Sequence, residues 1–360
     1  MRSLLALLLI GVTMILSACG GAPAATPSGA PAAAGVPAAA TAPTTPVIVA
    51  WYPNESGADL KGARDALAEV IGQALNRPVE HQTTTDYIIA IESIVNNNAH
   101  VAFFGAEGYV QAHERNDAIV PLVIPSGSDG SEETAVYYSW LAVMRGQEGN
   151  YQENGVYALD NIQGKRFSFV SNSSTSGFRV PSSNIVRYFG AMERWNGLTA
   201  DDLIEGGADA FFADVQFGGS HQGAAVNLIT DKVDVASFCD TCVANYVTLV
   251  EGTANTVGAV YRVNDAADEP FDKYPGAEFV LIASVPVLNA PFVANSSMLS
   301  AEEIQALQAA FTSDAVAANE RIFATQAAID AGFKPLFRKT DAERFLVISD
   351  SFFDPIRAMR

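Results

Sequence analysis

The fold of this chain can be predicted from one segment, Phe167-Ser168-Phe169-Val170-Ser171-Asn172-Ser173-Ser174-Thr175-Ser176-Gly177. Its first four residues alternate and are rich in strand formers. Beyond the glycine, apolar residues recur at roughly helical spacing, at Val180, Ile185, Val186 and Phe189. A strand that ends in hydroxyl residues and then opens a helix indicates an anion site. The first N–H groups of a helix have no partner within it, and the helix dipole is positive there.

The hydroxyl residues of this segment support the same interpretation. Ser174, Thr175 and Ser176 would add donors to the anion site, and Gly177 would let the backbone approach the ligand closely. The alternative is that Ser174 or Thr175 simply caps the helix. These residues alone leave both interpretations open.

The N-terminus predicts export. One positive charge, Arg2, precedes an almost wholly apolar run over residues 4–16, which predicts a secretory signal over residues 1–18. The following Leu16-Ser17-Ala18-Cys19 resembles the bacterial lipoprotein signal, which implies cleavage before Cys19 and a lipid on its thiol. Acyl chains would hold the protein at the periplasmic or extracellular face of the cell membrane. The alternative is a plain cleaved signal with an incidental cysteine.

Residues 19–46 form the next part of the chain. After Cys19 they are nearly all Ala, Pro, Gly, Thr and Ser, without a charge or an aromatic residue. Such a composition cannot bury a core, so we expect a disordered linker between the anchor and the folded part. The remainder, residues 47–360, exceeds one ordinary core, and we expect two lobes.

The strongly negative net charge limits the kinds of molecule that this protein can bind. The formal net charge is −19. Nucleic acid binding needs basic patches that displace counterions, so we exclude it. A small anion is compatible with an acidic protein, because N–H dipoles can hold it in a cleft.

Two further cysteines, Cys239 and Cys242, stand in a Cys-x-x-Cys arrangement. Because an exported protein meets an oxidising compartment, we favour a local disulfide over a redox site. No second cysteine pair or nearby histidine pair completes a zinc set. The histidines show no metal-ligand spacing, so we expect neither a metal nor another cofactor; they are His81, His100, His113 and His221.

The periodicity of the chain predicts an α/β fold. Strands over 47–51, 79–83 and 100–105 alternate with helices over 60–75, 87–97 and from 108, the pattern of a parallel sheet covered by helices. Strands over 138–143, 167–170, 210–212, 233–238 and 278–284 and helices over 181–189 and 224–229 restart the pattern. C-terminal helices are expected over 301–311, 314–324 and 341–352. We expect lobe 1 over 47–143 plus 286–360, lobe 2 over 144–285, and a ligand cleft between them.

Four segments carry a resemblance to a known family. They are Asp86-Tyr87, Phe104-Gly105-Ala106-Glu107-Gly108-Tyr109-Val110, Ser174-Thr175-Ser176-Gly177 with Pro181, and Gly219-Ser220-His221 followed by Lys232-Val233-Asp234-Val235-Ala236. The chain resembles the phosphonate/phosphite/phosphate-binding proteins of ABC importers, which have the two-lobed type II periplasmic binding fold. The likeness spans about residues 47–350.

The resemblance implies a role for each site residue. Ser174, Thr175 and Ser176 would bind the oxygens of the anion, and Tyr109 and Tyr52 would donate hydroxyls. Asp240 would accept a hydrogen bond from a protonated oxyanion or pair with a ligand amine. His221 would donate to the anion or cap its own helix. The alternatives are structural: Tyr109 and Tyr87 as packing residues, and Asp240 as a residue that shapes the cysteine loop.

The sequence departs from the family pattern in three places. Ala106 and Glu107 replace a Pro and a small residue, and Glu107 would add negative charge near the anion unless it points away. Thr230-Asp231-Lys232 replaces the usual glycine, and the Cys-x-x-Cys around Asp240 is unusual. These departures leave the ligand open.

The predicted function is therefore capture of phosphonate, phosphite or phosphate by lobe closure. Hinge strands near 138–143 and 280–284 would bend, and the closed, monomeric form would dock on an ABC permease driven by its ATPase. Alternatives are a sulfonate, nitrate or other small organic anion, or a sensing lipoprotein. A serine hydrolase that uses Ser174 or Ser176 with His221 and Asp240 is disfavoured, because the chain lacks a Gly-x-Ser-x-Gly elbow. We expect no enzyme.

Overall fold

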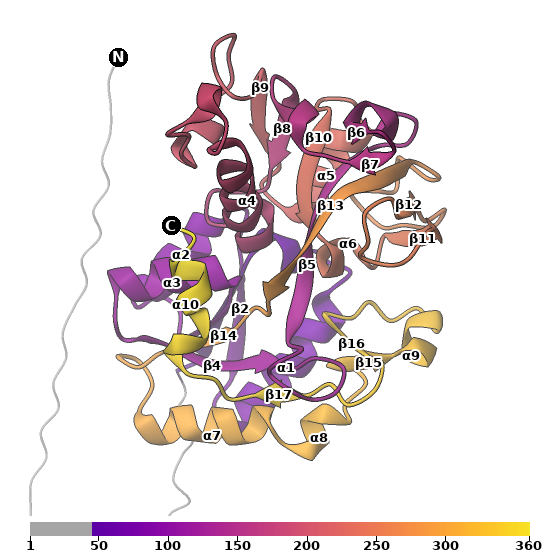
Figure 1. Ribbon diagram of the computed structural model, residues 1–360. Coiled ribbons are helices and arrows are strands. Elements are labelled where there is room, and N and C mark those ends of the chain that lie inside the picture. Colours follow the sequence, from indigo (N-terminus) through magenta and orange to yellow (C-terminus); the bar gives the residue numbers. More distant parts are fainter. Residues whose placement is uncertain (1–44) are drawn as a thin grey trace, which may run out of the picture. The chain divides into compact units, whose positions relative to one another are not determined.

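Two mixed sheets organise the chain, one of six strands and one of seven. The computed structural model describes residues 45–360, so the predicted signal peptide, Cys19 and nearly all of the linker lie outside the described residues. We call the six-stranded sheet with its helices lobe 1 and the seven-stranded sheet with its helices lobe 2 (Figure 1). None of the helices in residues 45–360 has the length and apolar character needed to cross a membrane.

Lobe 1 is built on the predicted strand–helix alternation. Its first strand β1 (Val47–Trp51) pairs in parallel with β2 (Val79–Thr83) and β3 (Val101–Phe103). The connections are α1 (Lys61–Leu75) and α2 (Tyr87–Val95), and α3 (Ala106–Arg115) follows β3. These elements confirm the strand–helix alternation predicted from residue 47 to the helix after the third strand. The sheet continues with antiparallel strands: β14 (Phe292–Asn295), β4 (Ile119–Pro125) and β17 (Phe345–Leu346).

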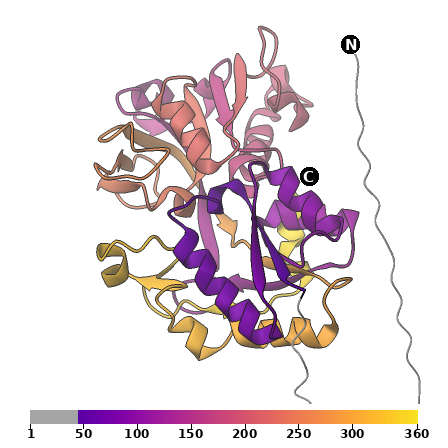
Figure 2. The ribbon, with the colours of Figure 1, turned by 180° about the vertical axis from the view of Figure 1, so that it is seen from behind.

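Alternation along β1 explains the layers of lobe 1. Val49 and Trp51 share one core with α1 and α7 (Ala301–Phe311), whereas Ala50 and the following Tyr52 share another with α2 and α3. Figure 2 shows α1 crossing the sheet of this lobe. Tyr52 thus leaves β1 on the same side as α2 and α3.

Lobe 2 has the strand order β11-β12-β13-β5-β10-β8-β9. Direct parallel pairing in this sheet joins β10 to β8 and β8 to β9, and the other neighbouring pairs are antiparallel. Its strands are β5 (Val136–Met144), β8 (Arg166–Phe169), β9 (Asp214–Phe217), β10 (Val235–Cys239), β11 (Val247–Glu251), β12 (Val260–Val263) and β13 (Glu278–Leu288). Its main helices are the short turn η4 (Thr175–Arg179), α4 (Val180–Phe189), α5 (His221–Ile229) and α6 (Asp240–Val243).

Two long paired strands, β5 and β13, leave lobe 2 in the direction of lobe 1 (Figure 1). Their register shifts between Leu281 and Ala283, which marks a bulge. The predicted lobe boundaries at 143/144 and 285/286 fall inside these strands, and both strands pair within the sheet of lobe 2. The boundaries themselves stay a prediction.

Three predicted elements are wrong, each because aromatic residues pack into a core. Residues 210–212 form no strand; Phe211 and Phe212 are buried and the strand β9 starts after them. The helix predicted over 314–324 ends at Ala317 as α8, and the chain then turns into the short strand β15 (Phe323–Thr325) beside β16 (Phe337–Lys339). Residues 341–352 contain β17, since Phe345 reaches Phe311 at 5.2 Å between ring centroids.

Candidate ligand-binding site

The serine–threonine segment opens α4 through one π-helical turn, η4. The N–H groups of Arg179 and Val180 donate to the carbonyls of Ser174 and Thr175, each five residues back. Such turns are rare inside helices and occur frequently at functional sites. The turn widens the helix at the position where the sequence places the hydroxyl residues.

Pro181 gives a physical reason for the π turn. It has no N–H to donate to the carbonyl of Gly177, and its ring would crowd that carbonyl in an ordinary α-helix. The Gly177 carbonyl instead accepts from Ser237 Oγ at 2.8 Å and from the Val170 N–H at 3.2 Å. A Cβ at Gly177 would lie 2.3 Å from a methyl carbon of Val170, so only glycine fits.

The start of this turn is capped and also leaves donors without acceptors. Ser174 Oγ accepts from the N–H of Gly177 at 3.1 Å, so the capping interpretation is confirmed. Within the described residues, the N–H groups of Thr175 and Ser176 reach no acceptor, and the buried Ser176 Oγ has no partner. Buried polar groups are almost always hydrogen-bonded, so these donors lack an acceptor that an anion would supply.

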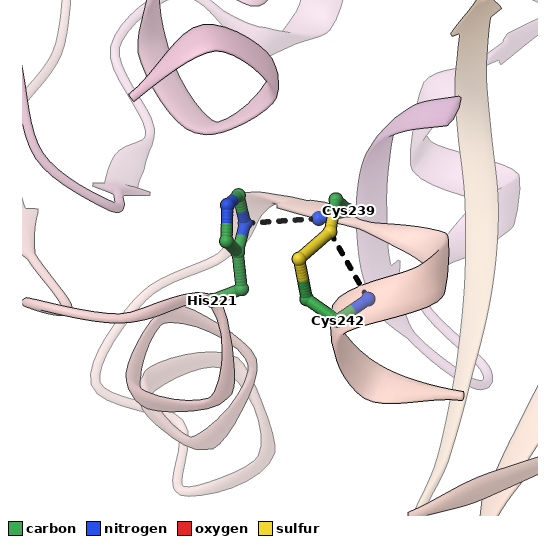
Figure 3. A group of neighbouring side chains, drawn as sticks. All are labelled: His221, Cys239 and Cys242. Carbon is green, nitrogen blue, oxygen red and sulfur yellow. Dashed lines mark hydrogen bonds between the residues drawn. A yellow bond between two sulfur atoms is a disulfide. The ribbon is translucent and has the colours of Figure 1, made fainter. Parts of the chain in front are cut away.

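His221 at the start of α5 supports the same turn. Its Nδ1 accepts from the N–H of Cys239 at 3.0 Å (Figure 3), so the proton of the neutral ring is on Nε2, which lies 3.4 Å from Ser174 Oγ. Burial lowers the pKa of His221 to about 3, so the ring stays neutral. Its backbone N–H donates to Asn54 Oδ1 of lobe 1 at 3.0 Å.

A disulfide joins Cys239 and Cys242 beside this histidine (Figure 3). Ligand atoms of His221 and of both cysteines lie within 4.8 Å of one another, a spacing that suits a metal ion. Because the two sulfur atoms are bonded to each other, neither is a thiolate able to hold a metal.

Asp240 lies between the two cysteines. Its Oδ1 accepts from the N–H of Tyr138 at 2.9 Å and its Oδ2 from Asn255 Nδ2 at 3.2 Å. Burial raises the pKa of Asp240 to about 6, and no cation pairs with it among the ion pairs of residues 45–360. At pH 7 the carboxyl group of Asp240 is therefore mainly ionised and can accept a hydrogen bond. No positively charged side chain of the described residues pairs with it.

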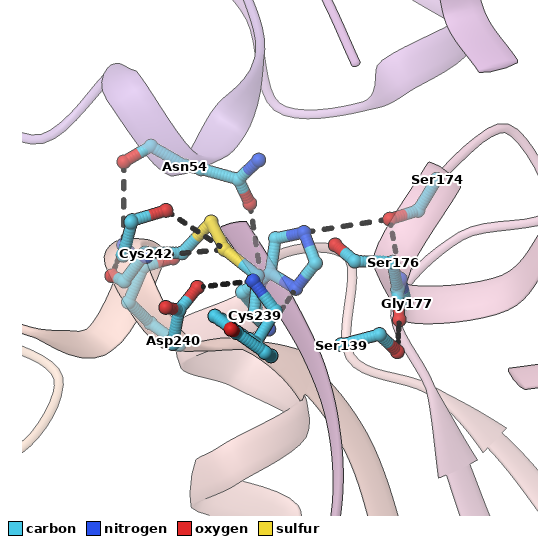
Figure 4. The surroundings of a disulfide bond; sticks show 12 residues. Asn54, Ser139, Ser174, Ser176, Gly177, Cys239, Asp240 and Cys242 are labelled. Carbon is cyan, nitrogen blue, oxygen red and sulfur yellow. Dashed lines mark hydrogen bonds between the residues drawn. A yellow bond between two sulfur atoms is a disulfide. The ribbon is translucent and has the colours of Figure 1, made fainter. Parts of the chain in front are cut away.

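A cavity of about 750 Å³ brings these groups together between the lobes. Five of the seven predicted ligand-binding residues line it, namely Tyr52, Ser174, Thr175, His221 and Asp240, whereas Ser176 and Tyr109 do not. Tyr87, Tyr137, Asn54, Glu55 and Asn255 also line it. Figure 4 shows Asn54 facing the serine turn and the disulfide from the opposite lobe. The cleft therefore has polar groups on both walls.

The prediction for Tyr109 does not hold. This tyrosine is fully buried, its hydroxyl donates to Asp350 Oδ1 at 2.6 Å, and it does not line the cavity. The position that sequence reasoning set aside as packing, Tyr87, lines the cavity and accepts from Asn54 Nδ2 at 2.6 Å. One feature of the sequence could have indicated this role of Tyr87, namely its place at the first position of α2, directly after the capping residue Asp86. The sequence around Tyr137 has no comparable feature.

Tyr52 contributes an aromatic wall. Its ring lies 4.0 Å from that of Tyr87 and 4.9 Å from that of Phe104, centroid to centroid. Its buried hydroxyl has no hydrogen-bond partner. A Cβ on Gly108 would lie far inside contact distance of this hydroxyl, so the glycine makes room for it.

Glu107, which the sequence placed near the anion, is neutralised by pairing. It is fully buried, and its Oε1 lies 3.1 Å from Arg179 of lobe 2 and 3.3 Å from Arg360. Its backbone N–H donates to Thr175 Oγ1 at 2.9 Å across the lobes. The negative charge of Glu107 is therefore paired with arginines, and its contacts link the two lobes.

Comparisons with known proteins identify the family of the chain. A family model described as the periplasmic substrate-binding protein of phosphonate ABC transporters matches residues 49–340. The chain is 27% identical, over 242 residues, to the phosphate-import protein PhnD of Mycolicibacterium smegmatis, covering 63% of this chain and 69% of that protein.

Two solved structures are similar in fold. PhnD1 from Prochlorococcus marinus in complex with methylphosphonate has a TM-score of 0.60 at 16% identity, covering 87% of this chain and 96% of that chain. A binding protein component of an ABC phosphonate transporter from Pseudomonas aeruginosa has a TM-score of 0.61 at 18% identity, covering 88% of this chain and 86% of that chain. Together with the two sheets, these likenesses confirm the predicted two-lobed α/β binding-protein fold.

Proposed function

The chain belongs to the family of periplasmic substrate-binding proteins of phosphonate ABC transporters, and from this premise we propose that it captures phosphonate, phosphite or phosphate between its lobes. One observation carries the choice of a tetrahedral oxyanion. The backbone N–H groups of Thr175 and Ser176 and the hydroxyl of Ser176 are donors without acceptors, at the positive end of a helix.

His221 and the tyrosines complete the donor set. Because the Nε2 proton of His221 points at Ser174 Oγ, and Gly177 N–H also donates there, the Ser174 hydroxyl is left to donate its own proton to a ligand oxygen. Lobe 1 adds the hydroxyls of Tyr52 and Tyr87. Since the full donor set exists only when both lobes meet, the ligand favours the closed form.

Asp240 favours an anion that carries a proton. An ionised carboxylate accepts a hydrogen bond from a P–OH group, but repels an anion that has no proton to give. Phosphate, phosphite and phosphonates hold such a proton near neutral pH, whereas sulfonate and nitrate do not. This contrast ranks the phosphorus oxyanions above the alternative ligands.

The same geometry argues against a hydrolase. A general base must accept the proton of its serine. His221 instead presents Nε2–H to Ser174, because its Nδ1 is occupied by the Cys239 N–H. We propose that the protein binds its ligand without chemistry and that closure bends β5 and β13.

The family suggests the transport partners and the cellular location of this protein. The closed, monomeric form would deliver its anion to a membrane permease and ATPase. Acyl chains on Cys19 would keep the protein at the outer face of the cell membrane, with the linker as tether. A sensing lipoprotein is the second candidate for this setting, and it uses the same cleft.

The test is a thermal-shift screen of the purified protein. The panel holds phosphate, phosphite, methylphosphonate, aminoethylphosphonate, sulfate, nitrate and taurine. A ligand at 100 times its dissociation constant should add about 2.7 kcal/mol of stability. A response confined to phosphorus oxyanions supports the proposal. A response to sulfate, taurine or nitrate alone contradicts the proposal that the ligand is a phosphorus oxyanion. No response to any of these anions favours a protein that senses another class of solute.

A further inference from the structure

A second carboxyl group lines the cavity and takes no part in the site described above. Glu55 ends the short helical turn η1 (Pro53–Glu55), which follows β1 and Tyr52. Its side chain is only 9% exposed, it lines the same cavity, and its Oε2 has no hydrogen-bond partner. A buried carboxyl oxygen without a partner is costly if ionised, and it indicates a missing ligand atom.

The groups around Glu55 do not neutralise it. The one nearby cation, Arg64 of α1, directs its guanidinium to the backbone carbonyls of Glu55 and Gly57, and no ion pair joins the two side chains among residues 45–360. The other titratable groups facing it are the hydroxyls of Tyr52, Tyr87 of α2 and Tyr137 of β5, which supply no positive charge. Burial raises the pKa of Glu55 to about 8.

Glu343 is a second buried glutamate of this cavity. It also lines the cavity and is equally 9% exposed. Its two oxygens accept from the N–H groups of Thr340 and Asp341 and from the Thr340 hydroxyl. These hydrogen bonds lower its pKa, so it stays ionised. A partnered carboxylate and an unpartnered carboxylic acid thus share one cavity.

We propose that Glu55 is a specificity-determining residue that donates a hydrogen bond from its protonated carboxyl to an oxygen of the bound oxyanion. The inference rests on the proposed capture of a phosphorus oxyanion. Glu55 would then donate to a P–O⁻ oxygen while Asp240 accepts from P–OH, so that the two acids together recognise a singly protonated anion. Ionisation of Glu55 would replace a donor by a negative charge and expel the ligand.

The test compares wild type with Glu55→Gln, which keeps a donor of the same shape but cannot ionise. Dissociation constants for inorganic phosphate and methylphosphonate are measured by calorimetry from pH 6.5 to pH 9. The ligands titrate in this range too, so the readout is the ratio of the wild-type to the variant constant at each pH. We expect this ratio to rise about tenfold between pH 7 and pH 9, because the protonated fraction of a group of pKa 8 falls by that factor.

Proton uptake gives a second readout. Calorimetry at pH 9 in two buffers of different ionisation heat should show about one more proton bound per ligand in wild type than in Glu55→Gln. The matched control is Glu343→Gln, whose pH profile above pH 8 should keep the wild-type slope.

Three outcomes contradict the inference. A constant ratio with equal proton uptake means that Glu55 does not titrate on binding. A ratio that falls with pH means that an ionised Glu55 attracts the ligand, as it would a cationic group. If no phosphorus oxyanion binds to either protein at any pH, the proposed function fails, and the role of Glu55 fails with it.

Discussion

Two helix starts face each other across the cleft, and they have different tasks. The start of η4 in lobe 2 leaves the N–H groups of Thr175 and Ser176 without acceptors. The start of α3 in lobe 1 uses the Glu107 N–H to bind Thr175 Oγ1 and the Glu107 carboxylate to bind Arg179. Both segments carry family motifs, but only the first also holds a buried serine hydroxyl, that of Ser176, without a hydrogen-bond partner. The bonds that the Glu107 N–H and carboxylate make to lobe 2 separate the helix start that joins the lobes from the one that keeps this hydroxyl unpartnered.

Loss of the lobe 2 donors should have the largest effect. Thr175→Val combined with Ser176→Ala removes two hydrogen bonds to a charged ligand, worth roughly 3 kcal/mol. We expect phosphate or methylphosphonate binding to weaken at least tenfold in calorimetric titration. The control is Ser300→Ala, which removes a serine cap from α7 away from the cavity and should lower stability without changing affinity. Unchanged affinity in a folded double mutant would remove the proposed site.

The comparison extends to two carboxylates, the half-buried Asp240 and the buried Glu107. Because Asp240 has a pKa raised above that of the unfolded chain, its burial destabilises the free protein once pH exceeds about 4, fully so above about 6. Asp240→Asn should therefore stabilise the ligand-free protein at pH 7.5 by about 2 kcal/mol. It should also weaken binding of protonated oxyanions. Urea unfolding at pH 4 and pH 7.5 measures the first effect; a variant less stable than wild type at pH 7.5 would contradict it.

Glu107→Gln should destabilise the ligand-free protein, in contrast to Asp240→Asn, which should stabilise it. It leaves Arg179 beside a neutral amide and removes an ion pair between the lobes. We expect the ligand-free protein to lose stability and oxyanion binding to weaken about tenfold, roughly 1.4 kcal/mol, because closure loses a contact while every donor remains. Small-angle scattering should show a larger radius of gyration without ligand. A variant with unchanged radius and affinity would show that this contact does not hold the lobes together.

Local sequence patterns predicted the strands that alternate with helices in lobe 1 and the two long apolar strands β5 and β13, and missed several short strands. The strand–helix alternation through β1, α1, β2, α2 and β3 could be predicted, since each connection is a periodic helix. The strands β4, β11, β12 and β14 were not predicted, because short apolar strands joined by loops have no such period. Where helices were overextended, Phe323 and Phe345 turned the chain into extended segments by packing on distant aromatic residues.

The site was predictable where one segment supplies several groups. The Ser174–Gly177 turn is continuous in sequence, so its chemistry is visible there. Tyr87 and Glu55 come from separate elements, and only packing decides which way they face. The prediction that Tyr109 binds the ligand was wrong. Its motif gives its place on α3 but not the direction of its hydroxyl, which is fixed by the hydrogen bond to Asp350.

The π turn at Thr175–Arg179 has a consequence for which changes of chain length this protein tolerates. Each residue of a helix advances the chain by about 100° around the axis. Deleting one residue from this turn would convert it to ordinary helical geometry, and it would rotate the hydroxyls of the turn toward a different wall while the helix beyond Pro181 stayed in place. We therefore expect this segment to tolerate the exchange of a side chain better than the gain or loss of a residue.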